Sequence, residues 1–241
     1  MPNFNVKLKN KKEVAEGTAA FYFQKPLHFQ FKPGQFVTMT LIDPPATDSE
    51  GNSRAFTIAS APWETDLMIA TRMRDTAFKR VLNALPIGSD VKIGGPFGTL
   101  LLDLQSARSV VFLAGGIGIT PFKSMMEYVA DKKLPNDLKL LYSNKTPELI
   151  AYKKELDALC EANPNFEAAY TITRPEESKV AWTGHTGRIN EDFIRKHAPD
   201  YSKRLWYLCA GDSMVAGMLT LLESMGVEKK RVKREVFTGL H

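Results

Sequence analysis

A short stretch near residue 55 combines a cation, an aromatic ring and a hydroxyl group at strand spacing. In a β-strand, Arg54 and Phe56 face one side while Ala55 and Thr57 face the other. An arginine recognises phosphate through a planar, bidentate pair of hydrogen bonds. The neighbouring ring and hydroxyl suit the ring system of an aromatic cofactor. The pattern therefore indicates a site for a phosphate-bearing aromatic cofactor.

The segment 71–79 reads as a strand end followed by a helix that begins at Thr76. Free amides at a helix N-terminus bind phosphate oxygens, and the helix dipole assists them. Two interpretations stay open, because a Thr at this position is also the ordinary cap of a surface helix. The first predicts a phosphate site, and the second predicts only a barrel strand with a capped helix.

A glycine-rich turn, Gly115-Gly116-Ile117-Gly118-Ile119-Thr120-Pro121, follows the apolar strand 109–115 and opens a helix. Glycine lets the backbone approach a pyrophosphate closely, and Pro is well tolerated in a first helical turn. The motif is not the GxGxxG fingerprint, so a plain strand-to-helix turn is the alternative. Its placement between strand and helix favours a dinucleotide loop.

The end of the next strand carries Ser143, Asn144 and Lys145. In dinucleotide folds this position reads the ribose 2′ group, often through an acid when the ligand is NAD. This position has no Asp or Glu that would repel a 2′-phosphate, and it has no Arg that would bind one. Lys145 and Arg174 are either phosphate ligands or solvated charges, so NADPH and NADH both stay open.

Two segments near the C-terminus carry further reactive groups. Cys209 ends an apolar strand before the small turn Ala210-Gly211, and Glu235-Val236-Phe237 closes the chain's final predicted strand. A free Cys is most often a small buried hydrophobe. These residues are thus either ordinary strand residues or part of a reaction centre.

The secondary-structure elements that position these residues follow two different patterns along the chain. Short strands separated by Gly and Pro are predicted over 3–10, 19–24, 35–42, 54–60, 66–73 and 90–94, with a helix over 76–85. Strands then alternate with helices: strands 109–115, 138–144, 166–172, 204–211 and 232–237, helices 121–131, 148–161 and 213–225. We therefore predict an antiparallel six-stranded β-barrel domain over 1–105, followed by a Rossmann-like parallel α/β domain over 106–241.

The order of these motifs resembles the ferredoxin–NADP reductase-like superfamily, through RAFT, RDTAFK, GGPFG, GGIGITP and the Cys209 turn. The resemblance implies bound FAD, with its phosphates held by Arg54 and by the amides of Thr76 to Phe78. It also implies that Phe56 and Thr57 touch the flavin ring and that Cys209 lies against the nicotinamide. Glu235 and Phe237 match the family's terminal acid and flavin-covering aromatic. Phe56 stands where the family often has Tyr, which puts one flavin hydrogen bond in doubt.

The predicted site residues follow from both arguments, and no metal ligand is among them. The predicted catalytic residues are Thr57, Cys209 and Glu235. The predicted cofactor-binding residues are Arg54, Ala55, Phe56, Thr57, Thr71, Arg72, Thr76, Ala77, Phe78, Phe237, Gly115, Gly116, Gly118, Thr120, Ser143, Asn144, Lys145 and Arg174.

The predicted function is hydride transfer between NAD(P)H and FAD, with electrons passed to a one-electron carrier such as ferredoxin, flavodoxin or an oxygenase component. Two alternatives stay open: a reductase that uses flavin as substrate, and a degenerate regulatory module that senses NAD(P)H. Two cysteines without metal spacing hold no iron–sulfur cluster and favour a cytoplasmic protein. The net charge of +5 is mild and comes without a nucleic-acid motif, and no apolar window reaches membrane-span length.

Overall fold

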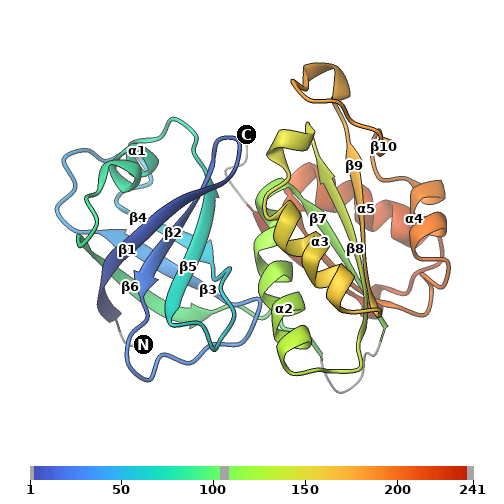
Figure 1. Ribbon diagram of the computed structural model, residues 1–241, viewed down its shortest axis with the longest axis horizontal. Helices are drawn as coiled ribbons and strands as arrows, with labels where there is room; N and C mark the ends of the chain where they lie inside the picture. The colour runs from blue at the N-terminus through green and yellow to red at the C-terminus, as the bar shows by residue number, and fades with distance from the viewer. Residues whose placement is uncertain (1–2, 104–108, 238–241) are drawn as a thin grey trace.

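The computed structural model describes residues 3–103 and 109–237. Two six-stranded sheets lie side by side, one from each half of the chain (Figure 1). The predicted boundary between residues 105 and 106 lies outside the described residues.

The first sheet is antiparallel, with strand order β4-β3-β6-β1-β2-β5. Its strands are β1 (Asn3–Ala15), β2 (Thr18–Gln24), β3 (Phe36–Leu41), β4 (Ser53–Thr57), β5 (Asp66–Arg72) and β6 (Asp90–Phe97). Alternate side chains along β3 are buried, and they fill one core together with helix α1 (Ala77–Ala84). The six predicted antiparallel strands are confirmed. The edge strands β4 and β5 do not share a ladder. The chain after β4 meets β5 at the bridge between Ile58 and Ile69 and through hydrogen bonds of residues 59 and 60 with Met68.

The second sheet is parallel, with strand order β10-β9-β8-β7-β11-β12. Its strands are β7 (Ser109–Gly115), β8 (Asp137–Asn144), β9 (Phe166–Ile172), β10 (His185–Thr186), β11 (Leu205–Gly211) and β12 (Val232–Phe237). Its helices are α2 (Thr120–Asp131), α3 (Lys153–Ala162), α4 (Glu191–His197) and α5 (Asp212–Ser224). Helices α2 and α3 cover one face, and α4 and α5 cover the other (Figure 1). The predicted α/β arrangement is confirmed, and it is the arrangement that gives parallel strands their continuous apolar runs.

Two local predictions were wrong. The predicted helix 148–161 begins only at Lys153, because Tyr152 adopts a left-handed backbone conformation with φ +61° that interrupts it. The short strand β10 and helix α4 were not predicted, since two strand residues and a seven-residue helix leave too weak a periodic signal.

Candidate dinucleotide and flavin sites

The glycine turn is held tightly at the carboxyl ends of the parallel strands. Gly115 ends β7 beside Ser143 of β8, and a short 3₁₀ helix (Gly116–Ile119) leads into α2. The Tyr142 hydroxyl donates a hydrogen bond to the Gly116 carbonyl at 2.9 Å. A Cβ atom on Gly118 would lie 2.0 Å from the Cys209 carbonyl oxygen, so only glycine fits there. The turn is therefore fixed where ligands bind in open α/β sheets.

A cavity of about 600 Å³ opens beside this turn. Gly115, Gly116, Ser143 and Asn144, which the sequence predicts as dinucleotide ligands, line it. Its lining also holds five cationic side chains and, among the described residues, no Asp or Glu. These cations are Arg72, Arg74, Lys145, Arg174 and Arg188. Such a cavity suits a ligand that carries several negative charges.

Asn144 adds a buried polar side chain to the lining of this cavity. The residue is 4% exposed and lines the cavity, and neither polar atom of its side-chain amide has a hydrogen-bond partner among the described residues. The amide lies near the Tyr142 hydroxyl, whose proton is donated to Gly116, so Tyr142 offers no donor to the Asn144 Oδ1 atom. Since buried amides are normally satisfied, Asn144 is suited to a polar ligand atom.

Arg72 reaches into this cavity from the first sheet. Its Nη2 atom lies 2.4 Å from the position that a Cβ on Gly116 would take, and Gly116 itself has φ +55°. Burial and the charge of Arg74 lower the pKa of Arg72. The prediction listed Arg72 as a cofactor ligand without assigning it to either cofactor, and the structure places it in the lining of this cavity.

A second positive region surrounds the N-terminus of α1. The Thr76 hydroxyl accepts a hydrogen bond from the Lys79 amide at 3.3 Å, so its side chain serves as the helix cap. Burial lowers the pKa of Lys79 to about 8, assisted by the charges of Arg74 and Arg54. A partly buried lysine that lies near two arginines makes this helix end suited to an anion. The residues present therefore fit the diphosphate of FAD at this helix end.

Arg54 is engaged by its own loop. Its guanidinium forms ion pairs with Asp48 and Glu50, the latter at 2.9 Å. It also donates to the carbonyls of Glu50 and Gly51 at 3.0 Å and lies 5.1 Å from the Phe78 ring centroid. The predicted phosphate clamp thus stands beside α1, but two carboxylates already occupy much of its donor capacity.

The other residues of the RAFT strand divide between core and surface. Phe56 is 9% exposed and packs against Phe78 with ring centroids 5.8 Å apart. Thr57 is buried at 6% exposure, while Ala55 is exposed. Phe56 therefore contributes to the core of the first sheet, in addition to any contact with a flavin.

The C-terminal residues lie next to one another but outside the dinucleotide cavity. Cys209 pairs in register with Glu235, and Gly211 pairs with Phe237. Cys209 is fully buried, and burial raises the pKa of its thiol well above the ordinary value, so the sulfur is not a thiolate nucleophile. Burial also raises the pKa of Glu235, whose Oε2 atom is buried without a partner among the described residues.

The remaining predicted residues have local roles in the structure. The Thr120 hydroxyl donates to the Ile117 carbonyl at 3.1 Å, and the Thr71 hydroxyl donates to the Arg72 carbonyl at 3.4 Å. Arg188 and Arg74 were not predicted. The sequence signal that could have identified Arg188 is its position after Gly187, at the end of strand β10, which was not predicted.

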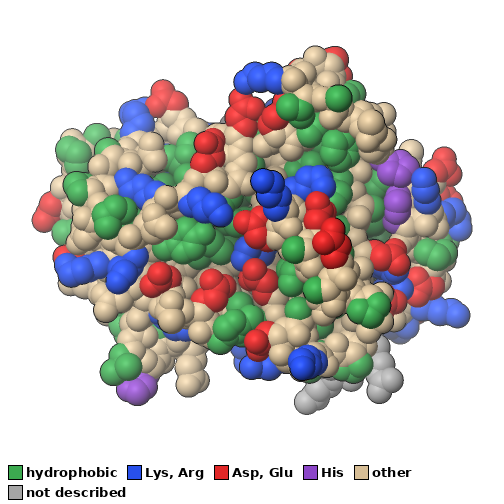
Figure 2. All heavy atoms as spheres, viewed as in Figure 1, with side chains coloured by type: hydrophobic (Ala, Val, Ile, Leu, Met, Phe, Trp, Pro, Cys, Tyr) green, Lys and Arg blue, Asp and Glu red, His purple; other side chains and the backbone are tan. Residues whose placement is uncertain are grey.

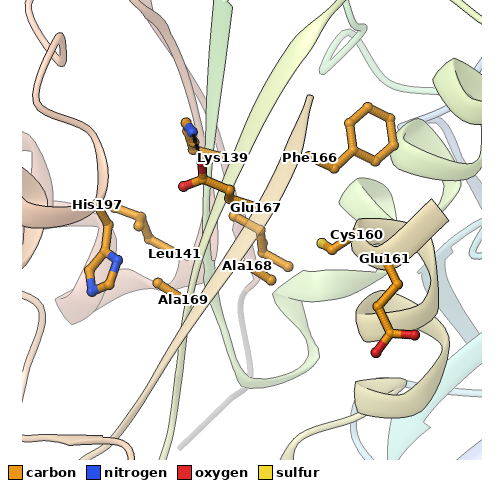
Figure 3. A pocket seen from close by; sticks show the side chains of 10 residues that line it. Lys139, Leu141, Cys160, Glu161, Phe166, Glu167, Ala168, Ala169 and His197 are labelled. Atoms are coloured by element: carbon orange, nitrogen blue, oxygen red, sulfur yellow. Dashed lines mark ion pairs between the residues drawn. The ribbon is translucent and has the colours of Figure 1, made fainter. Parts of the chain in front are cut away.

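Another depression, of about 360 Å³, lies at the amino ends of β8 and β9 (Figure 3). Its lining includes Cys160 and His197 as well as Lys139, which is ion-paired with Glu167. Burial raises the pKa of Cys160 to about 11. This depression is at the wrong end of the strands for a dinucleotide and is not part of the candidate site.

Charges of both signs are interspersed on the face shown in Figure 2. The basic segment 229–234 is partly neutralised, because Lys229 pairs with Glu223 at 3.0 Å and Lys230 pairs with Glu228 at 2.6 Å. The helices within the described ranges are all too short or too polar to cross a membrane.

Comparison with known proteins agrees with this geometry. The family described as "Oxidoreductase FAD-binding domain" matches residues 5–101, and the family described as "Oxidoreductase NAD-binding domain" matches residues 112–219. The chain is 30% identical over 223 residues to the glycine betaine monooxygenase reductase subunit of Chromohalobacter salexigens, covering 91% of this chain and 60% of that protein. It is 28% identical to NADH-cytochrome b5 reductase 1 of Aspergillus oryzae, covering 94% of this chain and 80% of that protein.

Among solved structures, a ferredoxin NADP+ reductase from Neisseria gonorrhoeae with bound FAD and NADP shares the fold. The TM-score is 0.80 at 19% identity, covering 97% of this chain and 98% of that one. The two matched ranges include most of both sheets and the glycine turn between β7 and α2, while β12 lies beyond the second range. The chain therefore combines an oxidoreductase FAD-binding domain with an oxidoreductase NAD-binding domain, and it shares the fold of the ferredoxin NADP+ reductase.

Proposed function

We propose that this protein is an NADPH-oxidising flavoprotein reductase that binds FAD and passes electrons to a separate one-electron acceptor. Bound FAD supplies the chemistry, because it accepts a hydride and releases electrons singly. The chain's own residues hold the two cofactors and align them. In this proposal residues 1–105 bind the flavin, and residues 106–241 bind the dinucleotide.

The observation that carries the proposal is the dinucleotide cavity. It combines the tightly held glycine turn, the unsatisfied amide of Asn144 and five cations with no described acid in the lining. A pyrophosphate needs close backbone approach and positive charge, and the cavity offers both. The depressed pKa of Lys79 adds a separate anion site for the flavin diphosphate.

NADPH is favoured over NADH by the charge at the far side of the cavity. Lys145 follows β8, where an acid would select NAD, and Arg174 and Arg188 follow β9 and β10. Arg174 forms an ion pair with Glu177 at 2.9 Å, whereas Arg188 forms no ion pair with any described residue. We therefore assign Arg188 and Lys145 as the principal ligands of a 2′-phosphate.

An external acceptor is part of the same proposal. The chain spans 60% of the length of the glycine betaine monooxygenase reductase subunit that it matches. Relatives that are named as reductase subunits support an oxygenase component as the acceptor. Within the described residues no cluster of three His, Cys, Asp or Glu side chains is placed to hold a metal. We propose that the electrons pass from the flavin to an acceptor protein in the cytoplasm.

One observation favours a second function, in which flavin is a substrate rather than a resident cofactor. Asp48 and Glu50 compete with phosphate for Arg54, so the loop that carries them opposes flavin retention. Gel filtration separates the two functions. A resident cofactor co-elutes with the protein in near-stoichiometric amount, whereas a substrate flavin is lost.

Steady-state reduction by each dinucleotide tests the donor assignment. We expect Arg188→Ala to raise the KM for NADPH at least about tenfold, because the variant loses one charge-assisted hydrogen bond to phosphate. The KM for NADH should stay nearly unchanged. Lys203→Ala, a change of an exposed basic residue outside the cavity lining, is the control. Equal effects of Arg188→Ala on both dinucleotides would refute the 2′-phosphate assignment.

A further inference from the structure

Helix α2 is attached to the first sheet by buried polar groups immediately after the glycine turn. Ser124 is fully buried, and its hydroxyl donates to the Ser60 carbonyl at 2.7 Å. Lys123 is 5% exposed; its ammonium group donates to the Ala59 carbonyl at 3.4 Å and pairs with Glu127 at 2.6 Å. Helix α2 faces the first sheet in Figure 1.

The corner that receives these bonds is itself rigid. The Met68 amide donates to the Ser60 hydroxyl at 3.0 Å, and the Ala59 amide donates to the Met68 carbonyl at 2.8 Å. Residues 59 and 60 lie two and three positions after Thr57, the last residue of the RAFT strand. The α2 contacts are therefore made to the strand that the flavin site is built on.

Tyr152 adds a third contact to the same corner. Its hydroxyl lies 3.9 Å from the Met68 sulfur, and its ring lies 5.2 Å from the Lys123 ammonium group. Tyr152 is 2% exposed and is held at φ +61°, a conformation that a bulky residue keeps only where its surroundings fix it. The interface thus fixes a strained residue, as expected for a junction with one defined geometry.

We infer that Lys123 and Ser124 are positioning residues for hydride transfer. The inference rests on the proposed function. The 3₁₀ helix of the glycine turn ends at Ile119, four residues before Lys123, and the RAFT strand ends two residues before Ala59. The junction therefore sets the distance between the two cofactor sites. Transfer between a nicotinamide carbon and a flavin nitrogen is steeply sensitive to that distance, and a displacement of about 1 Å can cost about a hundredfold in rate.

Ser124→Ala tests the inference, because it removes one interdomain hydrogen bond with little loss of volume. We expect flavin content and dinucleotide affinity to stay within about twofold of the parent protein and hydride transfer to slow at least about tenfold. The long-wavelength charge-transfer absorption between reduced flavin and oxidised dinucleotide should weaken, since it reports ring overlap. Oxidation of dithionite-reduced protein by ferricyanide should be unchanged.

The flavin-free protein gives a readout that does not depend on activity. The amides of Ala59 and Met68 should exchange with deuterium faster in Ser124→Ala than in the parent. Ser224→Ala is the matched control, because among the described residues that hydroxyl bonds only to the Leu221 carbonyl within α5. The double variant Lys123→Met with Glu127→Gln removes the second contact without stranding a buried acid, and it should give the same pattern.

Three outcomes would overturn the inference. Parent-like transfer rates and charge-transfer absorption in both variants would show that the junction is structural only. Equal slowing of both half-reactions would indicate general destabilisation rather than misalignment. Failure of the parent protein to be reduced by either dinucleotide would refute the proposed function and this inference together, whereas the first two results leave that function standing.

Discussion

Replacement of Gly116 by Ala should impair the dinucleotide site and leave the flavin site unchanged. Gly116 has φ +55°, and an added Cβ would lie 2.4 Å from Nη2 of Arg72, where ordinary contacts begin near 3.4 Å. The backbone conformation alone should lower the free energy of unfolding by about 1–2 kcal/mol. Arg72 must in addition move by about 1 Å, a displacement that can reduce an aligned transfer step by up to about a hundredfold.

Stopped-flow bleaching of the flavin band by NADPH is the direct assay for Gly116→Ala. We expect normal flavin content and a reduction rate about 10 to 100 times lower than in the parent. Gly88→Ala is the matched control, because Gly88 has φ +92° and open space around the added Cβ. That variant should lose similar stability and keep the parent rate. Parent-like reduction in Gly116→Ala would refute the assignment of the cavity to the dinucleotide.

Three further predictions concern the flavin site and the buried thiol. Asp48→Asn should tighten flavin binding severalfold by freeing Arg54, as measured by titration of flavin-free protein; weaker binding would instead make Asp48 an orienting partner of Arg54. Flavin affinity should fall as the pH rises above about 8. The reason is that a bound diphosphate raises the lowered pKa of Lys79, so that binding takes up a proton at high pH. This pH dependence of flavin affinity should vanish in Lys79→Met. Over the same pH range the flavin-free protein should gain stability from Lys79, since the unfolded chain holds that proton more tightly. Cys209→Ser should slow reduction by NADPH without affecting reoxidation by ferricyanide, and a parent-like rate would assign the fully buried thiol to the core.

The strand–turn–helix around Gly116 was predictable because its signals are local. An apolar strand, a glycine turn and a Pro in the first helical turn each restrict the backbone independently, and all three agree. The six strands of the first sheet were predictable for the same reason, from alternation and turn residues. The exact helix start at Lys153 was not, because the left-handed Tyr152 is imposed by contacts across the interface.

The site was predicted less completely than the fold because its charges meet through tertiary structure. Arg72 belongs to β5 and yet reaches the Gly116 turn, about forty residues later in the chain. The carboxylates that engage Arg54 come from an irregular loop, whose course no periodic pattern predicts. The same holds for the bond between Ser124 and Ser60, which joins two elements that have separate sequence signals.

The most direct test of the central claim is an anaerobic titration of the purified protein, followed by its visible spectrum. We predict that the protein carries near-stoichiometric FAD and that NADPH bleaches the flavin band more effectively than NADH. We also predict that ferricyanide restores the band. Protein that co-purifies with FAD but is bleached by neither dinucleotide would contradict the claim.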